Sequence, residues 1–147
     1  MEERLGRLLA LTGKVVREHF DRSLATVGSS LNTYVVLKTA YLRPGVSQRQ
    51  LAAWVGIEGP TLTHHLDRLA SDGLIERVRN QTDRRVCYVE LTPAGQAHLD
   101  RVEAFAEAQD KEFRSLFTPD EAATLTRLLT RVRERFTEEA HVRDAAG

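Results

Sequence analysis

Apolar residues recur along this chain every three or four positions in long stretches, which are separated by short polar or glycine-containing breaks. Such spacing gathers the apolar side chains on one side of an α-helix, so each stretch predicts an amphipathic helix. The predicted helices cover residues 3–27, 31–42, 48–55, 94–117 and 119–140, with one more between Pro60 and Gly73. Between residues 74 and 91 apolar and polar residues alternate singly, which predicts a β-hairpin with strands at 74–79 and 85–91.

The breaks around residues 47–60 carry specific signals for how helices begin and end. Ser47 and Gln50 have the spacing of a capping box, in which each side chain accepts a hydrogen bond from the other residue's backbone amide. Gly56 permits a sharp turn after this first helix, and Pro60 fits the start of the next one because its missing N–H costs little there. Two short helices joined by a tight glycine turn constitute a helix-turn-helix.

The turn of the predicted hairpin concentrates positive charge. The segment RVRNQTDRR holds the basic residues Arg77, Arg79, Arg84 and Arg85 against a single acid, Asp83. The whole chain, in contrast, has 21 basic and 21 acidic residues and no net charge. A helix-turn-helix followed by an arginine-tipped hairpin predicts a winged helix, whose second helix fits the DNA major groove while the hairpin reaches phosphates or the minor groove.

The helix between Pro60 and Gly73 has an apolar stripe and a polar face. The stripe consists of Leu62, Leu66 and Leu69, and the polar face with its flanks carries Thr61, Thr63, His64 and Arg68. Because such helices read bases with their N-terminal residues, we expect base contacts from the two threonines and His64 and a phosphate contact from Arg68. His65 is expected to pack partly inward. Ser47 and Gln48 are candidates for a phosphate contact aided by the helix dipole.

Length and composition narrow the class of protein further. With 147 residues, 41% hydrophobic and 29% charged, the chain fits one soluble globular domain. The first residues, MEERLGRLLALTGKVV, are too charged for a signal peptide or a membrane span, so we expect a cytoplasmic protein without a membrane partner. The single cysteine, Cys87, cannot form an internal disulfide, which agrees with a reducing compartment.

Catalytic and metal-binding patterns are missing from the sequence. We find no nucleophile beside a base and no glycine-rich phosphate loop, so neither enzymatic activity nor a cofactor is expected. The histidines, His19, His64, His65, His98 and His141, form no cluster with the spacing of metal ligands. Cys87 is expected to be a small buried residue, with a redox-responsive regulator as the alternative. A helical dimer that binds proteins without sequence-specific DNA binding is a further alternative, which predicts an eroded hairpin tip.

The run GIEGPTLTHHLDRLASDGLIERVRNQTDRRVCYVELTPAG resembles the MarR family of bacterial transcription regulators, and its opening GIEGPTLTHHLDRL looks like the SlyA branch. The resemblance implies that Asp83 positions Arg85 for the minor groove. It also implies a homodimer, usually a repressor, with a cleft for a small aromatic or phenolic effector. The candidates for that cleft are His19, Tyr34 and Lys38. His64 departs from the family, in which arginine is often found at this position.

Together these patterns predict a mainly α-helical protein with a small β-hairpin wing. We expect a single MarR-type domain over residues 1–147, with a winged helix-turn-helix at 31–92 and dimerisation helices at 1–28 and 93–147. The long outer helices carry more apolar surface than a small winged helix can cover, and a second copy would bury it. The predicted function is transcriptional regulation, as a homodimeric repressor bound to a pseudo-palindromic operator in double-stranded DNA.

Overall fold

The computed structural model describes the backbone of residues 3–145 and the side chains of residues 3–137. Within this range the chain folds into six α-helices and one two-stranded sheet, as predicted. In chain order these elements are α1 (Leu5–Ala25), α2 (Leu31–Leu42), α3 (Gln48–Val55), α4 (Gly59–Ser71), β1 (Ile75–Arg79), β2 (Cys87–Leu91), α5 (Pro93–Ser115) and α6 (Pro119–Ala145). Helices α2 and α3 begin and end where the sequence predicts, and the ends of the other helices differ from the predicted ones by a few residues.

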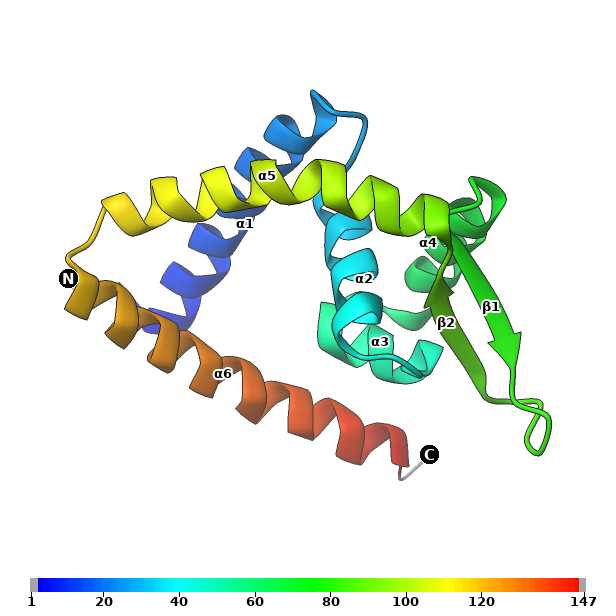
Figure 1. Ribbon diagram of the computed structural model, residues 1–147. Coiled ribbons are helices and arrows are strands. Elements are labelled where there is room, and N and C mark those ends of the chain that lie inside the picture. The colour runs from blue at the N-terminus through cyan, green and yellow to red at the C-terminus, as the bar shows by residue number, and fades with distance from the viewer. Residues whose placement is uncertain (1–2, 146–147) are drawn as a thin grey trace.

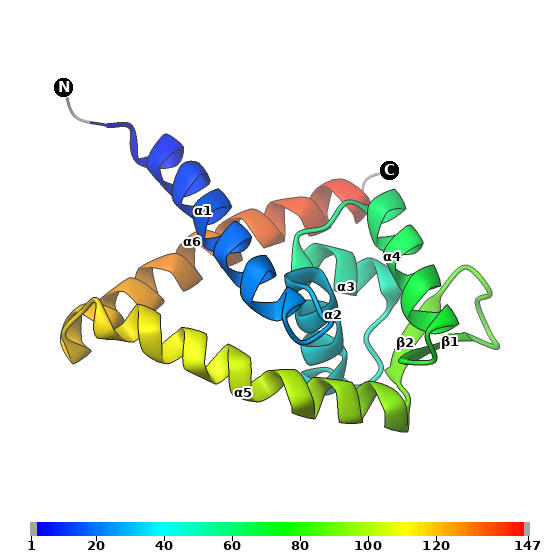
Figure 2. The same cartoon turned by 90° about the horizontal axis from the view of Figure 1, so that it is seen from above.

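The elements from α2 to β2 lie together at one end of the molecule, and we call them the reading head (Figure 1). Helix α5 starts at the hairpin and leads away from the reading head, and α6 returns toward it and contacts α3 (Figure 1). The N-terminal end of α1 projects beyond the other helices (Figure 2). The long helices α1, α5 and α6 therefore extend the molecule well beyond the reading head.

The hydrophobic core lies where the helices α2 to α5 and the C-terminal end of α1 meet the hairpin. Its fully buried side chains are Leu24, Val36, Leu37, Leu51, Leu62, Leu66, Ile75, Val89 and Val102. Each such side chain stabilises the fold by about 1.5–3 kcal/mol relative to exposure. The predicted stripe of α4 is part of this core, with Leu69 only 3% exposed. Burial of the stripe turns the polar face of α4 to solvent.

The turn between α3 and α4 has the predicted form. Ser47 Oγ accepts a hydrogen bond from the Gln50 amide at 3.1 Å, and Gln50 Oε1 accepts one from the Ser47 amide at 3.0 Å. Gly56 ends α3 with a φ of 68°, in the left-handed region that favours glycine. Pro60 takes the second position of α4, where its missing N–H breaks no helical hydrogen bond.

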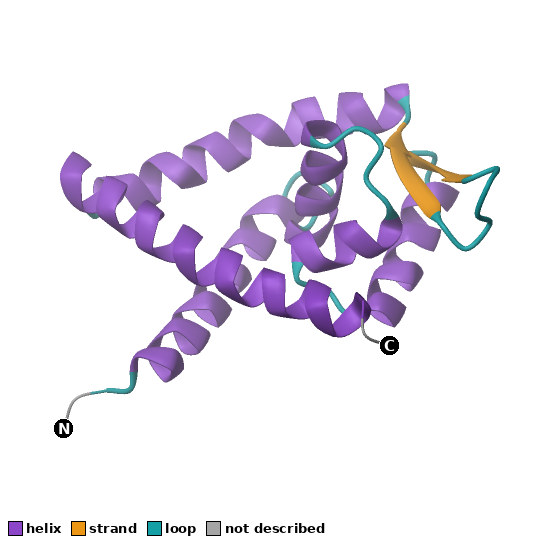
Figure 3. Ribbon diagram, turned by 90° about the horizontal axis from the view of Figure 1, so that it is seen from below, coloured by secondary structure: helices purple, strands orange, loops and turns teal. Residues whose placement is uncertain are grey.

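The hairpin is antiparallel and lies beside the helices, with Ile75 opposite Leu91 and Arg79 opposite Cys87 (Figure 3). Its second strand begins two residues later than predicted. The reason is a tightened turn, in which the Val86 amide donates to the Asp83 carbonyl at 3.0 Å. The hairpin is anchored to the core because the Val89 amide donates to the Val46 carbonyl at 3.1 Å.

Large apolar side chains remain exposed on the three long helices. They include Leu5, Leu8, Leu11 and Val15 on α1, Phe105 on α5, Leu116 and Phe117 between α5 and α6, and Leu125, Leu128, Leu129, Val132 and Phe136 on α6. Exposed apolar surface on this scale marks an interaction surface. Among the described residues, none of the helices combines the length and apolar character needed to cross a lipid bilayer.

Candidate nucleic-acid interface

The outward face of α4 presents Thr61, His64 and Arg68 to solvent, as predicted. His65, in contrast, packs partly inward, and its Nε2 is buried without a hydrogen-bond partner in the described part of the chain. Burial lowers the pKa of His65, and the positive charge of Arg68 adds to this shift. His65 is therefore neutral at neutral pH and belongs to the packing side of α4, whereas His64 belongs to its solvent side.

Thr63 and Gln48, which the sequence nominates for DNA contact, bond to each other. Gln48 Nε2 donates to Thr63 Oγ1 at 2.8 Å, and the Thr63 hydroxyl donates to the Gly59 carbonyl at 3.0 Å. These bonds tie the start of α3 to the first turn of α4 and occupy the Thr63 hydroxyl and one N–H of the Gln48 amide. Ser47 is similarly engaged, because its amide and its Oγ both serve the capping box. Gln48 and Thr63 thus connect the two helices, whereas Ser47 caps α3.

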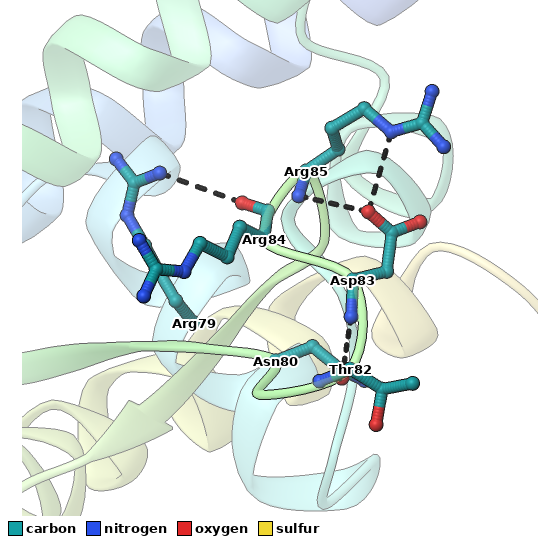
Figure 4. Close-up of polar contacts among 6 residues, drawn as sticks. All are labelled: Arg79, Asn80, Thr82, Asp83, Arg84 and Arg85. Carbon is teal, nitrogen blue, oxygen red and sulfur yellow. Dashed lines mark hydrogen bonds and ion pairs between the residues drawn. The ribbon is translucent and has the colours of Figure 1, made fainter.

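The hairpin turn is organised by Asn80 (Figure 4). Its Oδ1 accepts hydrogen bonds from the amides of Thr82 at 2.7 Å and Asp83 at 3.1 Å. Its Nδ2 donates to the Tyr88 hydroxyl at 2.9 Å, which ties the turn to β2. The sequence analysis missed this role, although an asparagine that starts a polar turn commonly bonds the backbone two or three residues ahead.

Asp83 and Arg85 form the contact expected of the hairpin tip. Asp83 Oδ1 accepts from the Arg85 amide at 3.0 Å and from Arg85 Nε at 3.2 Å (Figure 4). The Arg85 side chain is nevertheless 92% exposed, so this ion pair contributes little stability. Its effect is orientation, because Nε is fixed while the two terminal nitrogens bond no other described residue. Those two nitrogens are available to a ligand in solvent.

The remaining arginines of the hairpin do not form one group. Arg79 Nη1 donates to the Arg84 carbonyl at 3.4 Å, and the Arg79 and Arg85 side chains diverge on either side of the turn (Figure 4). Arg77 lies further from the tip and forms an ion pair with Asp67 of α4 at 2.6 Å, with its side chain 30% exposed. Sequence reasoning placed Arg77 with the tip and missed Asp67, which connects the hairpin to α4.

We predict that the Asp67–Arg77 pair is energetically coupled. In a double-mutant cycle of Asp67→Asn and Arg77→Gln, the coupling energy should be about 0.5–1 kcal/mol, because the pair is partly exposed and screened by solvent. Urea unfolding of the four proteins measures it. The matched control combines Asp67→Asn with Arg79→Gln, whose effects should add. Equal coupling in both cycles would contradict a specific contact.

A groove of about 820 Å³ separates α3 and α4 from the hairpin tip. Asp83, Arg85 and Thr63 line it, so it lies between the first turn of α4 and the organised turn. Cys87 also lines this groove and is half-buried, so the expectation of a buried core cysteine is wrong. The reason is its place at the first residue of β2, where the strand leaves the core; Val89, two residues on, is fully buried.

A second cavity, of about 440 Å³, lies between α1, α2 and α5. Tyr34 lines it, whereas Lys38 reaches its edge through an ion pair with Glu103 at 2.8 Å. His19 does not line the cavity and instead contacts Glu112 at 3.3 Å. The sequence analysis missed the acidic residues that α5 contributes, because it treated α5 only as a dimerisation helix.

Metal-ligating side chains do not gather in the described part of the chain. Among residues 3–137 no three His, Cys, Asp or Glu side chains lie close enough to hold a metal ion. His141 lies outside the described side chains.

A helix-turn-helix that turns a polar face outward beside an arginine-tipped hairpin defines a winged-helix DNA-binding protein. The sequence model of the MarR family matches residues 30–87. A putative transcriptional regulatory protein for the hcr operon of Thauera aromatica is 32% identical over 127 residues, which span 85% of this chain and 76% of that protein. The chain belongs to the MarR family of transcriptional regulators, which are DNA-binding proteins.

Solved structures show the same fold in complexes with DNA. A mutant MarR from E. coli complexed with operator DNA is 28% identical, with a TM-score of 0.76 over 87% of this chain and 92% of that chain. The transcriptional repressor CouR bound to a 23-mer DNA duplex is also 28% identical, with a TM-score of 0.78 over 88% of this chain and 92% of that chain. These similarities extend beyond the reading head to the long helices.

Proposed function

We propose that this protein is a homodimeric transcriptional repressor of the SlyA-like branch, which binds a pseudo-palindromic operator and is released by a small aromatic or phenolic ligand. The observation that carries the proposal is the oriented Arg85. Asp83 holds its guanidinium at Nε, and the Arg85 side chain is 92% exposed. A groove separates it from the first turn of α4. A free, positioned guanidinium at this place suits a narrow minor groove beside the major groove that α4 enters.

Each DNA-contact candidate nominated from the sequence receives a role in this proposal. Thr61 and His64 contact base edges in the major groove, and Arg68 contacts phosphate. Arg85 enters the minor groove, with Arg79 and Arg84 on the flanking phosphates. Thr63, Gln48 and Arg77 support these contacts through their bonds within the protein. Ser47 has only its hydroxyl proton left for a phosphate.

Residues 1–147 of each chain form a single MarR-type domain. The exposed apolar faces of the long helices support a homodimer of two such chains. Residues 1–28 and 93–147 then serve dimerisation, and residues 31–92 serve DNA binding. A two-fold axis between two copies presents two α4 helices about 34 Å apart, the spacing of one turn of B-DNA. The operator is therefore an inverted repeat. The two α4 helices of the dimer must fit their major grooves together. A ligand that changes the distance between the two reading heads therefore releases the protein from DNA.

We predict that Leu128→Glu separates the dimer. Leu128 on α6 is 42% exposed, and burial of a leucine contributes about 1.5–3 kcal/mol. Two symmetric copies double the loss, so the dimer dissociation constant should rise by about a hundredfold or more. Sedimentation equilibrium measures it, with Arg133→Glu on the same helix as the control. An unchanged dimer with Leu128→Glu would remove α6 from the proposed interface.

We predict that His64→Ala relaxes base preference. A side chain that contacts a base edge contributes about 1–3 kcal/mol of discrimination at one position of each half-site. Selection from randomised duplexes should show that this position becomes less constrained, whereas Arg68→Ala should lower affinity for all sequences alike. A selected sequence identical to that of the wild type would exclude His64 from base contact.

The experiment that tests the proposal is a salt titration of binding to random duplexes, followed by sequencing of the retained fraction. A steep decrease of affinity with salt is expected because each protomer neutralises several phosphates. The retained fraction should contain an inverted repeat. No retention at any salt concentration by a folded dimer would contradict the proposed function and favour a protein partner.

A further inference from the structure

The cavity between α1, α2 and α5 has aromatic side chains in its wall. Phe20 from α1 and Tyr34 from α2 line it. Phe20 is fixed in place, because its ring stacks on Phe113 of α5 with 5.6 Å between the centroids and 22° between the planes. A volume of about 440 Å³ is within the range of sites for small organic molecules. The wall therefore offers a planar ring a rigid apolar contact.

The rest of the lining comes from α5 and is mostly acidic. Helix α5 contributes three carboxylates, Glu103, Glu107 and Asp110, and one ammonium group, that of Lys111. Two of the carboxylates have cationic partners that do not line the cavity. Glu103 pairs with Lys38 at 2.8 Å, and Asp110 pairs with Arg114 at 2.6 Å.

Glu107 is the carboxylate with no such partner. It lies one helical turn before Lys111, yet no ion pair within 4.0 Å joins Glu107 to any described residue. A bound carboxylate would have to approach Glu107 as a like charge. A bound ammonium group would give Glu107 the partner that the chain does not supply.

The environment of Tyr34 agrees with this electrostatic picture. Burial raises the pKa of the Tyr34 hydroxyl, and the carboxylate of Glu103 adds to the effect. Lys38 opposes the shift, and Glu107 and Asp110 add smaller contributions that raise the pKa. Tyr34 therefore stays neutral and can hydrogen-bond a ligand. The aromatic end of the cavity thus lies next to the carboxylates of α5.

We propose that the effector of this protein is a small aryl-alkyl amine, whose ring packs against Phe20 and Tyr34 and whose ammonium group pairs with Glu107. The inference rests on the proposed function, since it identifies the ligand of the proposed effector site. It adds a positive charge to the small aromatic ligand that the family resemblance implies.

Three probes with the same ring and a two-carbon spacer test the charge preference. They are phenethylamine, the neutral phenethyl alcohol and the anionic hydrocinnamate. Isothermal titration of the full-length dimer should give the tightest binding for phenethylamine, with an advantage over hydrocinnamate of at least about fivefold. In Glu107→Gln this advantage should fall to about twofold or less, and in Glu107→Lys hydrocinnamate should bind more tightly than phenethylamine. Glu90→Gln, on the hairpin and outside the cavity, is the matched control.

Release of a labelled operator, measured separately, distinguishes failure of the inference from failure of the proposed function. Amine binding that depends on Glu107, together with release of the operator, supports the inference. The same binding while the operator stays bound overturns the effector role and leaves the DNA binding of the proposed function intact. Equal or tighter binding of hydrocinnamate to the wild type overturns the inference and leaves DNA binding untouched. Absence of binding by all three probes, or amine binding that is unchanged in Glu107→Lys, overturns it as well.

Discussion

Replacement of Arg85 by alanine is expected to lower the affinity for operator DNA by about a hundredfold while the fold and the dimer stay intact. Asp83 holds Arg85 Nε, and the guanidinium is otherwise exposed, so its removal takes no partner from the core. A charge-assisted contact of this kind contributes about 1.5 kcal/mol, which is about tenfold, and the dimer has two. Fluorescence anisotropy with a labelled duplex measures the loss.

Two control variants separate the position of Arg85 from its charge. Arg22→Ala removes the same charge from an exposed position at the end of α1, outside the reading head, and should change affinity by less than about threefold. Arg85→Lys keeps the charge but not the planar group and should fall between alanine and wild type. An equal loss in Arg22→Ala and Arg85→Ala would mean that only net charge matters, which would contradict the role proposed for the hairpin tip.

The features that the sequence predicts well depend on neighbours along the chain. The stripe of Leu62, Leu66 and Leu69 follows from helical spacing alone, and all three side chains are buried. The Ser47 capping box joins residues three apart, and its two hydrogen bonds form as expected. The helices and the hairpin could be predicted because hydrophobic burial and capping act within one or two turns.

The features that the sequence does not reveal depend on how separate elements dock. The Asp67–Arg77 pair needs the position of β1 against α4, and the Gln48–Thr63 bond needs the angle between α3 and α4. The acidic cavity forms only because α5 packs beside α1 and α2. In each case the side chains are ordinary surface residues in the sequence, and only the packing of the core brings them together.

Docking of α5 on the reading head depends on Gly95, the last residue of the quoted family resemblance. The Thr92 amide donates to the Leu74 carbonyl at 3.1 Å, and Thr92 Oγ1 accepts from the Gly95 amide at 3.0 Å. This brings the first turn of α5 onto the connection between α4 and β1. A Cβ atom on Gly95 would lie 1.9 Å from the Leu74 carbonyl oxygen and 2.9 Å from its carbon. Glycine is required here by close approach of two backbones.

Gly95→Ala is therefore expected to lower the free energy of unfolding by about 3 kcal/mol, because a backbone atom cannot move aside as a flexible side chain would. Urea unfolding measures the loss, and DNA affinity should fall with it because α5 and the hairpin meet at this turn. Gly13→Ala in α1 is the matched control, since its Cβ would meet no atom within 4 Å. This control should be neutral or stabilising by up to about 1 kcal/mol, as alanine favours helix. If the two variants have the same free energy of unfolding, the backbone at Leu74 can move aside at little cost. Its close approach would then not explain why residue 95 is a glycine.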